Sequence, residues 1–384
     1  MADKPIMEIN VVMLGGQRCG KTSVLAAMHE CFDDTFGRTD MTISTADSKT
    51  MAKLSEKREE FKSYYRGDEK YFETENKEGT QGFLDYSFYV TLKSKKSSCI
   101  KLNFTDMNGE FLHHNDKTDF KNGDVANCVK NADVIMITVD TPYLMEHLPD
   151  DSMESVGDYN NHRNKCDIIS ELIKNCFHTD ETSRKKMILF VPLKCEKYYW
   201  DKNVEYPLQN GLAIVAKRLK TAYKSLINYL SHENNRTCYE VAITPIMTMG
   251  NVLFSGFKRE TNPETGQREY SMNKKYDFPN IATYRFDDKI QTYEPAPKFC
   301  EQPFIYIILY MLRITKQQLS EKENSFWGKF IGNSIKKLRG FAFAEDFASQ
   351  EPELLDKIKT GNPPHYECGF EILTDPIRLE EYDT

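Results

Sequence analysis

The feature that most constrains this chain is a glycine-bounded loop between an apolar segment and an amphipathic one. The loop reads Gly-Gly-Gln-Arg-Cys-Gly-Lys-Thr over residues 15–22, which matches the pattern G-x-x-x-x-G-K-[ST]. The segment 9–14 before it is typical of a buried strand, and apolar residues at positions 24, 25, 28 and 32 after it have helical spacing. Strand, loop and helix together predict a phosphate-binding P-loop.

Each part of this loop has a predicted role in holding phosphate. Consecutive backbone N–H groups form an anion nest, and the dipole of the following helix adds positive potential. We expect Lys21 to reach the β- and γ-phosphates and Thr22 to place its hydroxyl on Mg²⁺. Glycines at the loop ends would supply its backbone angles. The predicted nucleotide-binding residues of the loop are Gly15, Gln17, Arg18, Cys19, Gly20, Lys21, Thr22 and Ser23.

A second motif, Asp-Met-Asn-Gly-Glu at 106–110, follows the predicted strand 99–104. A carboxylate at a strand tip opposite a P-loop holds Mg²⁺, usually through water, and we assign that role to Asp106. The backbone N–H of Gly109 would approach the γ-phosphate, so that the loop beyond it responds to that phosphate. The two motifs together predict binding of a nucleoside triphosphate with Mg²⁺.

The rest of the chain alternates apolar strands with helical segments. The predicted strands cover 82–92, 99–104, 132–139, 186–192 and 239–246, and the predicted helices cover 46–65, 160–177, 208–230 and 303–319. This alternation predicts an α/β fold, the three-layer sandwich of P-loop NTPases, in which helices cover both faces of a mostly parallel central sheet.

The chain divides into a main domain and an extension. We expect the domain to span 1–320, with an insertion at about 251–297, and the C-terminal extension to span 321–384. Within the extension, 325–339 carries apolar residues at helical spacing beside several lysines. Packing of this segment on the domain is favoured over contact with an anionic membrane or a partner groove.

Composition excludes several function classes. The formal net charge of −7 offers no general basic surface, so we expect no general nucleic-acid binding. The longest apolar stretch, 303–312, is shorter than the roughly 20 residues that span a bilayer. The chain begins without a signal segment, and its ten cysteines form no C-x-x-C pair. We therefore expect a soluble cytoplasmic protein with reduced thiols and without a zinc site.

The order of P-loop, polar loop with threonines, strand and D-x-x-G resembles the core of Ras-like GTPases of the translation-factor-related class. The resemblance covers about residues 8–250, and 303–319 would supply the last helix. The overall layout is also similar to bacterial GTPases of the double-GTPase type, which are linked to conflict and defence systems. The resemblance implies GTP as ligand and substrate, Mg²⁺ as cofactor, and a protein effector or a second GTPase as partner.

The resemblance also implies roles in catalysis. A threonine of the first switch loop contacts Mg²⁺ and the γ-phosphate in such proteins; Thr80 is the best match here and Thr74 the alternative. The residue after D-x-x-G is commonly a glutamine that orients water, but here it is Glu110. A carboxylate accepts a proton from water but adds negative charge near the γ-phosphate, which predicts slow hydrolysis. The predicted catalytic residues are Glu110, Lys21 and Thr80.

The P-loop itself departs from the family pattern. Gln17 stands where many members keep glycine, and its bulk would obstruct an arginine finger from a partner. Arg18 offers a positive charge in cis, although a surface side chain is the plainer interpretation.

The guanine-recognition motif of this family, N/T-K-x-D, corresponds to Leu-Lys-Cys-Glu at 193–196. Lys194 matches, and its stem would stack on the base, whereas Leu193 cannot supply the hydrogen bonds of Asn. Glu196 would accept the two guanine N–H groups in place of Asp. The loop 244–248 would occupy the last base-contacting position, without the usual sequence.

A slow GTPase that works as a nucleotide-dependent switch is the leading hypothesis. The alternatives are a scaffold that binds the nucleotide without hydrolysing it and an ATPase or kinase that uses the same P-loop.

Overall fold

A computed structural model describes most of the chain. The described residues are 7–32, 36, 40–66, 71–73, 82–94, 99–112, 123–147, 153–178, 185–199, 211–263, 266–272, 281–286, 294–324, 352, 354 and 369–374. Thr74, Thr80 and the segment 325–339 lie outside them.

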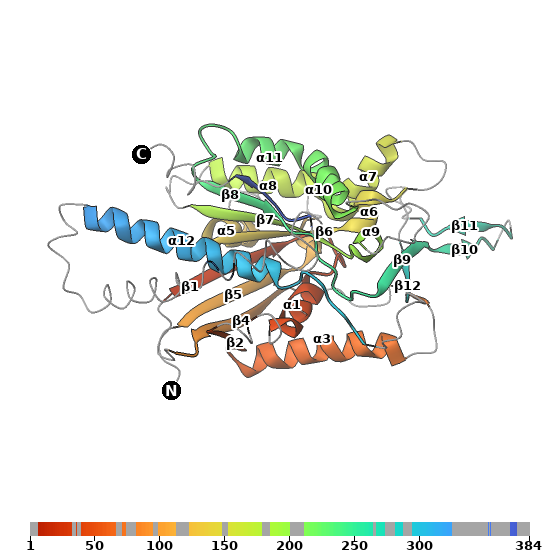
Figure 1. Ribbon diagram of the computed structural model, residues 1–384. Coiled ribbons are helices and arrows are strands. Elements are labelled where there is room, and N and C mark those ends of the chain that lie inside the picture. Colours follow the sequence, from red (N-terminus) through yellow and green to blue (C-terminus); the bar gives the residue numbers. More distant parts are fainter. Residues whose placement is uncertain are drawn as a thin grey trace.

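A central sheet runs through the molecule, with helices on both faces (Figure 1). Its strands are β1 (Met7–Leu14), β2 (Met41–Thr45), β4 (Phe83–Leu92), β5 (Cys99–Met107), β6 (Val134–Asp140), β7 (Lys186–Leu193), β8 (Tyr239–Ile243) and β13 (Glu371–Thr374). They lie in the order β13-β8-β7-β6-β1-β5-β4-β2. The strands from β8 to β5 in this order are parallel, and β4, β2 and β13 are antiparallel to their neighbours. The expected mostly parallel α/β sheet is confirmed.

How far each strand is buried follows from its position in the sheet. Every residue of β6 and β7 is buried, because both strands are covered on both faces; they are apolar apart from Thr138 and Asp140 in β6 and Lys186 in β7. β4 lies near the edge and alternates buried and partly exposed residues.

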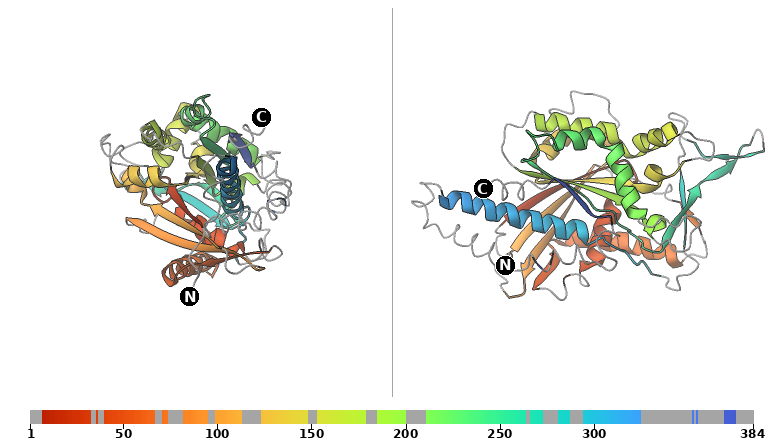
Figure 2. Two further views of the ribbon diagram at one scale, coloured as in Figure 1. Left: turned by 90° about the vertical axis from the view of Figure 1, so that its left-hand side faces the viewer. Right: turned by 45° about the horizontal axis from the view of Figure 1, so that its top comes forward.

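Two groups of helices enclose the sheet (Figures 1 and 2). One face carries α1 (Lys21–Glu30), α3 (Ser48–Arg66) and α12 (Gln302–Asn324), and the other carries α5 (Asp124–Asn131), α8 (Cys166–His178), α10 (Gly211–Ala222) and α11 (Lys224–Leu230). An aromatic cluster joins α12 to the first face: Phe304 packs 4.6 Å from Phe32, and Phe88 packs 5.8 Å from Phe104, between ring centroids. Tyr306 also hydrogen-bonds the buried Glu240 of β8.

Two predicted helices are each divided in two. The segment 160–177 belongs to α7 (Met153–Asn164) and α8, which are separated by Lys165 with a left-handed φ of 59°. The described part of the predicted helix 208–230 forms α10 and α11, separated by Tyr223 with φ −102° and ψ 20°. Apolar periodicity continues through both breaks, so it does not reveal them.

Short elements also connect the strands. They are the 3₁₀ helix η1 (Gly109–Leu112) after β5, α6 (Thr141–Met145) after β6 and α9 (Glu196–Tyr199) after β7. All three follow carboxyl ends of parallel strands, the edge of an open α/β sheet where ligands bind.

The segment expected as an insertion contains strands, including a hairpin. β9 (Val252–Phe257) and β12 (Ala282–Phe286) pair antiparallel, and β12 also pairs with β3 (Tyr71–Glu73), from the polar segment before β4. A hairpin, β10 (Arg259–Thr261) with β11 (Arg268–Tyr270), extends away from the body of the molecule (Figure 1). The insertion therefore contacts the segment in which the first switch loop is expected.

The C-terminal extension contributes to the main sheet. β13 adds an antiparallel strand beside β8, and Phe370 packs against Tyr306 with ring centroids 5.1 Å apart. Among the described residues, no helix is long and apolar enough to cross a membrane.

Candidate nucleotide site

The predicted P-loop connects β1 to α1 at the carboxyl edge of the sheet. Gly20 precedes the helix with a left-handed φ of 110°, which a side chain would strain. The Lys21 side chain folds back into the loop and is 6% exposed, and its Nζ donates to the carbonyls of Gly15 and Gly16, both at 3.0 Å. The ammonium group therefore lies inside the loop, where phosphate is expected.

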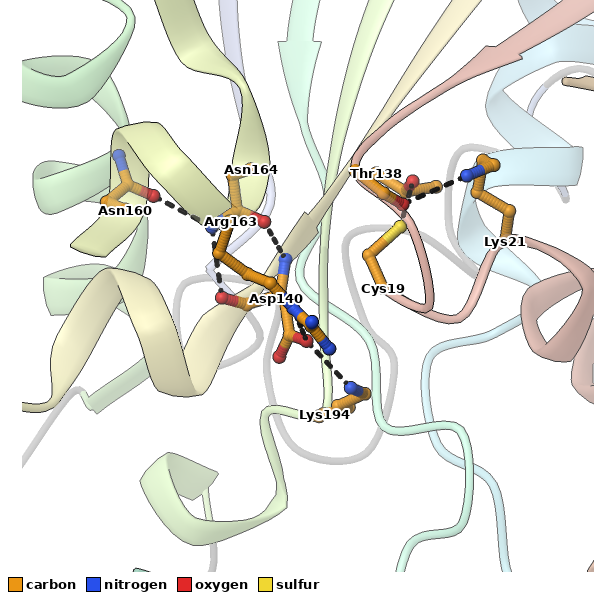
Figure 3. Close-up of polar contacts among 9 residues, drawn as sticks. Cys19, Lys21, Thr138, Asp140, Asn160, Arg163, Asn164 and Lys194 are labelled. Carbon is orange, nitrogen blue, oxygen red and sulfur yellow. Dashed lines mark hydrogen bonds and ion pairs between the residues drawn. The ribbon is translucent and has the colours of Figure 1, made fainter. Parts of the chain in front are cut away.

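The other side chains of the loop point in different directions. Cys19 is buried, and its Sγ lies 3.1 Å from Oγ1 of Thr138 on β6, so it anchors the loop to the sheet (Figure 3). Arg18 is exposed, with a left-handed φ of 59°. Gln17 and Ser23 are partly exposed.

Thr22 and Asp106 bring the two sequence motifs together. The Thr22 hydroxyl donates to Oδ2 of Asp106 over 2.6 Å, and the Asp106 side chain is fully buried. A hydroxyl and a carboxylate are hard oxygen donors of the kind that Mg²⁺ selects, so this pair fits the predicted metal. The described residues contain no cluster of three or more His, Cys, Asp or Glu that could hold a metal ion by itself.

The loop after Asp106 lies against the P-loop. A Cβ on Gly109 would lie 2.3 Å from the backbone nitrogen of Gln17, so only glycine permits this approach. Phe111 in η1 stacks on Phe83 of β4, with centroids 5.1 Å apart. Glu110 lies in η1, but its side chain is outside the described part of the structure.

The residues predicted to bind the base, Lys194 and Glu196, follow β7. Lys194 has a left-handed φ of 61°, and its Cε lies near Gly20, 3.9 Å from the position of a Cβ there. The lysine stem thus runs beside the P-loop, and its stacking on a base stays a prediction. Its Nζ lies 2.8 Å from Oδ2 of Asp140.

Glu196 is 2% exposed and faces the loop after β8. Its Oε1 accepts hydrogen bonds from the backbone nitrogens of Met249 at 3.0 Å and Gly250 at 3.2 Å. Burial raises the pKa of Glu196, and these hydrogen bonds oppose the shift. The neighbouring loop 244–248 contacts the end of β7, where the Ile246 nitrogen donates to Pro192. The structure thus brings the two predicted base-contacting loops together.

A buried charged cluster beside the P-loop was not predicted from the sequence. Asp140, at the carboxyl end of β6, is fully buried and pairs with Lys194 and with Nε of Arg163 at 3.4 Å (Figure 3). The Arg163 guanidinium lies over the Tyr143 ring, 4.8 Å from its centroid. Asn164 exchanges two hydrogen bonds with the Asp140 backbone, at 2.6 and 3.2 Å.

This cluster touches the P-loop directly, because a Cβ on Gly16 would lie 1.9 Å from the Arg163 carbonyl. The available sequence signal was the position of Asp140 at the end of an apolar strand, on the edge where ligands bind.

Tyr65 links α3 to the loop after β8. Its hydroxyl hydrogen-bonds the Asn251 side chain and lies 3.3 Å from the Met249 carbonyl. The helix that precedes β3 is thereby attached to the loop that holds Glu196.

A family of known proteins matches more than half of this chain. The family model described as Double-GTPase 2 matches residues 9–230, which contain both sequence motifs and Lys194. A search of curated proteins finds no match. Among solved structures, the GTPase-like domain of S. cerevisiae Ski7 bound to GTP is similar, with a TM-score of 0.30 and 15% identity over 63% of this chain. The same domain bound to GDP and inorganic phosphate has a TM-score of 0.27 and 14% identity over 63% of this chain. Each match spans 43% of the Ski7 chain.

Proposed function

Because the chain belongs to the Double-GTPase 2 family, we propose that it binds GTP with Mg²⁺, hydrolyses the GTP slowly and works as a nucleotide-dependent switch. The observation that carries this proposal is the 2.6 Å contact between Thr22 of the P-loop and Asp106 of D-x-x-G. In this contact the two predicted metal-binding groups meet, and the residue before Thr22 is the buried Lys21.

The P-loop would hold the phosphates. Lys21 contributes a positive charge whose position is fixed by two backbone carbonyls, and the loop amides add hydrogen-bond donors. Thr22 and Asp106 would hold Mg²⁺, which neutralises charge on the β- and γ-phosphate oxygens when bound. Thr80 remains our proposal for a third group at this metal.

The D-x-x-G loop would change conformation according to whether the γ-phosphate is present. Gly109 lies against Gln17, so a change at the phosphate end of the P-loop is transmitted to η1 by direct contact. Glu110 would position the attacking water. Its negative charge, and the Gln17 side chain beside the site, support slow turnover.

Guanine preference would come from the loops after β7 and β8. Lys194 lies along the P-loop and is held by Asp140, which fixes the stem for stacking on a base. Glu196 is the proposed acceptor for guanine N–H groups, and backbone hydrogen bonds already orient its carboxylate.

Calorimetry with GTP, GDP and ATP tests the site. Lys21→Ala should abolish measurable GTP binding, whereas Lys62→Ala, which removes a partly exposed lysine of α3, should leave it unchanged. Equal affinity of the wild type and Lys21→Ala would refute the phosphate site. Equal competition by GTP and ATP would refute the roles of Lys194 and Glu196 and favour the ATPase alternative.

Single-turnover hydrolysis separates a slow GTPase from a non-hydrolysing scaffold. We expect slow GTP cleavage by the wild type and a further decrease in Glu110→Ala. Tight GTP binding without cleavage in either protein would favour the scaffold.

We propose a protein effector or a second GTPase as the partner, in a bacterial conflict or defence system. The resemblance to double GTPases supports this proposal. Genes for a second GTPase or an effector beside the coding gene would strengthen it, and their absence in related genomes would count against it.

A further inference from the structure

Tyr65, the last residue but one of α3, reaches the loop after β8 with its hydroxyl. The side chain is 6% exposed, and the hydroxyl donates to Oδ1 of Asn251 and lies 3.3 Å from the Met249 carbonyl. Nδ2 of Asn251 donates in turn to the Glu294 carbonyl at 3.1 Å. The amide group therefore has one orientation, in which its oxygen accepts the phenol proton.

The segment 249–251 also holds the carboxylate of Glu196. Oε1 of Glu196 accepts hydrogen bonds from the backbone nitrogens of Met249 at 3.0 Å and Gly250 at 3.2 Å. Tyr65 and Glu196 thus bind the same three residues, Tyr65 through the Met249 carbonyl and the Asn251 side chain, and Glu196 through two N–H groups. A shift of this segment would move the groups that orient the carboxylate.

The segment is packed closely against the chain that precedes α12. Gly250 has a left-handed φ of 79°, and a Cβ there would lie 1.5 Å from the Ala296 carbonyl. The Ala296 nitrogen donates to the Met249 carbonyl at 2.8 Å. The Met249 peptide is therefore held by three groups: Ala296 and Tyr65 at its carbonyl side and Glu196 at its nitrogen.

The ring of Tyr65 is held in place by the sheet beside it. It packs against Phe286 of β12 with ring centroids 4.8 Å apart, where the end of α3 meets this strand (Figure 1). β12 pairs with β3, the strand that follows α3 in the chain. The phenol is thus presented to the loop by a packed framework.

We propose that Tyr65 is a positioning residue for recognition of the guanine base, a role that rests on the proposed binding of GTP and on Glu196 as the acceptor of the base N–H groups. Both loop amides bind Oε1 of Glu196, so Oε2 is the oxygen that we assign to the base. Hydrogen bonds weaken steeply when their angle is poor. By holding the peptide of Met249, Tyr65 keeps the carboxylate at the angle that the base requires.

The ligand feature that this arrangement recognises is the 2-amino group of guanine. Inosine triphosphate (ITP) keeps the N1–H group and the triphosphate but lacks this amino group. The preference for GTP over ITP therefore measures how well the carboxylate is placed, whereas phosphate binding contributes equally to both affinities.

The test compares Tyr65→Phe, which removes only the hydroxyl, with Tyr64→Phe. Tyr64 is the preceding residue of α3, and its hydroxyl donates within the helix to Glu60 at 3.2 Å. Displacement of the fluorescent nucleotide mant-GDP by GTP and by ITP is measured for each full-length protein with Mg²⁺. Asn251→Ala, which removes the acceptor of the phenol proton, is a second variant. Thermal unfolding checks that each protein is folded at the assay temperature.

We expect the wild type to prefer GTP over ITP by about tenfold or more, as a hydrogen bond to a carboxylate implies. Tyr65→Phe should lower this preference by roughly three- to fivefold, with little change in ITP affinity. Asn251→Ala should shift it in the same direction, and the double variant should go no further, since both changes remove one contact. Tyr64→Phe should match the wild type.

An unchanged preference in Tyr65→Phe and Asn251→Ala would overturn the role of Tyr65 and leave the proposed function intact. An equal loss of GTP and ITP affinity would also overturn it, because a general packing defect gives that result. A wild type that binds GTP and ITP equally would instead contradict the proposed role of Glu196, and failure to bind mant-GDP would contradict the proposed function itself.

Discussion

Asp140→Asn is the perturbation that best tests the buried cluster beside the P-loop. The carboxylate is fully buried and is the shared partner of two cations, Lys194 at 2.8 Å and Arg163 at 3.4 Å. The cation side chains are 13% and 12% exposed, so water screens them weakly. Asparagine keeps the shape of the side chain but leaves both positive charges without a counter-charge.

The magnitude follows from this burial. Removing one partner of a buried ion pair costs about 3–5 kcal/mol. The asparagine oxygen can still accept one hydrogen bond, and both cations retain some contact with water, so we expect about 2–4 kcal/mol. With an unfolding entropy of about 2 cal/mol/K per residue, this corresponds to a fall in Tm of roughly 3–5 °C for a chain of this length.

Calorimetric unfolding of four proteins measures this effect: the wild type, Asp140→Asn, Lys194→Met and the double variant. Removing Lys194 from the variant relieves part of its uncompensated charge, so the double variant should be less destabilised than the sum of the single changes by at least about 1 kcal/mol. Asp167→Asn, at an exposed position of α8, is the matched control and should change stability by less than about 0.5 kcal/mol. Strict additivity, or a shift in Asp140→Asn no larger than that of the control, would refute the assigned ion pairs.

Three further changes test other contacts. Gly109→Ala would place a Cβ 2.3 Å from the Gln17 nitrogen and should weaken GTP binding in calorimetry by roughly tenfold or more; full affinity would show that the two loops separate freely. Because burial raises the folded-state pKa of Glu196, its contribution to stability is present at acid pH and is lost as pH rises through that pKa, so the Tm advantage of Glu196→Gln should grow as the pH rises from about 4. A difference in Tm that is constant with pH would contradict this origin. Tyr65→Phe should lower stability by about 1–2 kcal/mol in denaturant titration, since it removes the hydroxyl bonded to Asn251; an unchanged midpoint would argue against that contact.

The sequence predicted what is encoded in contiguous motifs and in strong apolar runs. The P-loop places Lys21 and Thr22 by local backbone geometry alone, and the fully buried strands β6 and β7 are recognisable as mainly apolar segments. The contact between Thr22 and Asp106, 84 positions apart, could be predicted because both ends belong to motifs with a shared ligand.

Contacts without such a motif could not be predicted. Asp140 looks like any acidic residue at a strand end, and its partners Arg163 and Lys194 come from different elements. The breaks at Lys165 and Tyr223 lie within a periodicity that continues through them, so the sequence pattern does not reveal them.

The small sheet β3-β12-β9 also bears on the order of folding. Glu73 pairs with Thr283, roughly 210 residues later in the chain, so this contact closes a very long loop. Such a pairing contributes net stability only after nearly the whole domain has assembled. We therefore expect the β3–β12 pairing to form late and to open at a lower free energy than the central strands. The segment that precedes the proposed first switch loop would then exchange its amide hydrogens faster than β1 or β6.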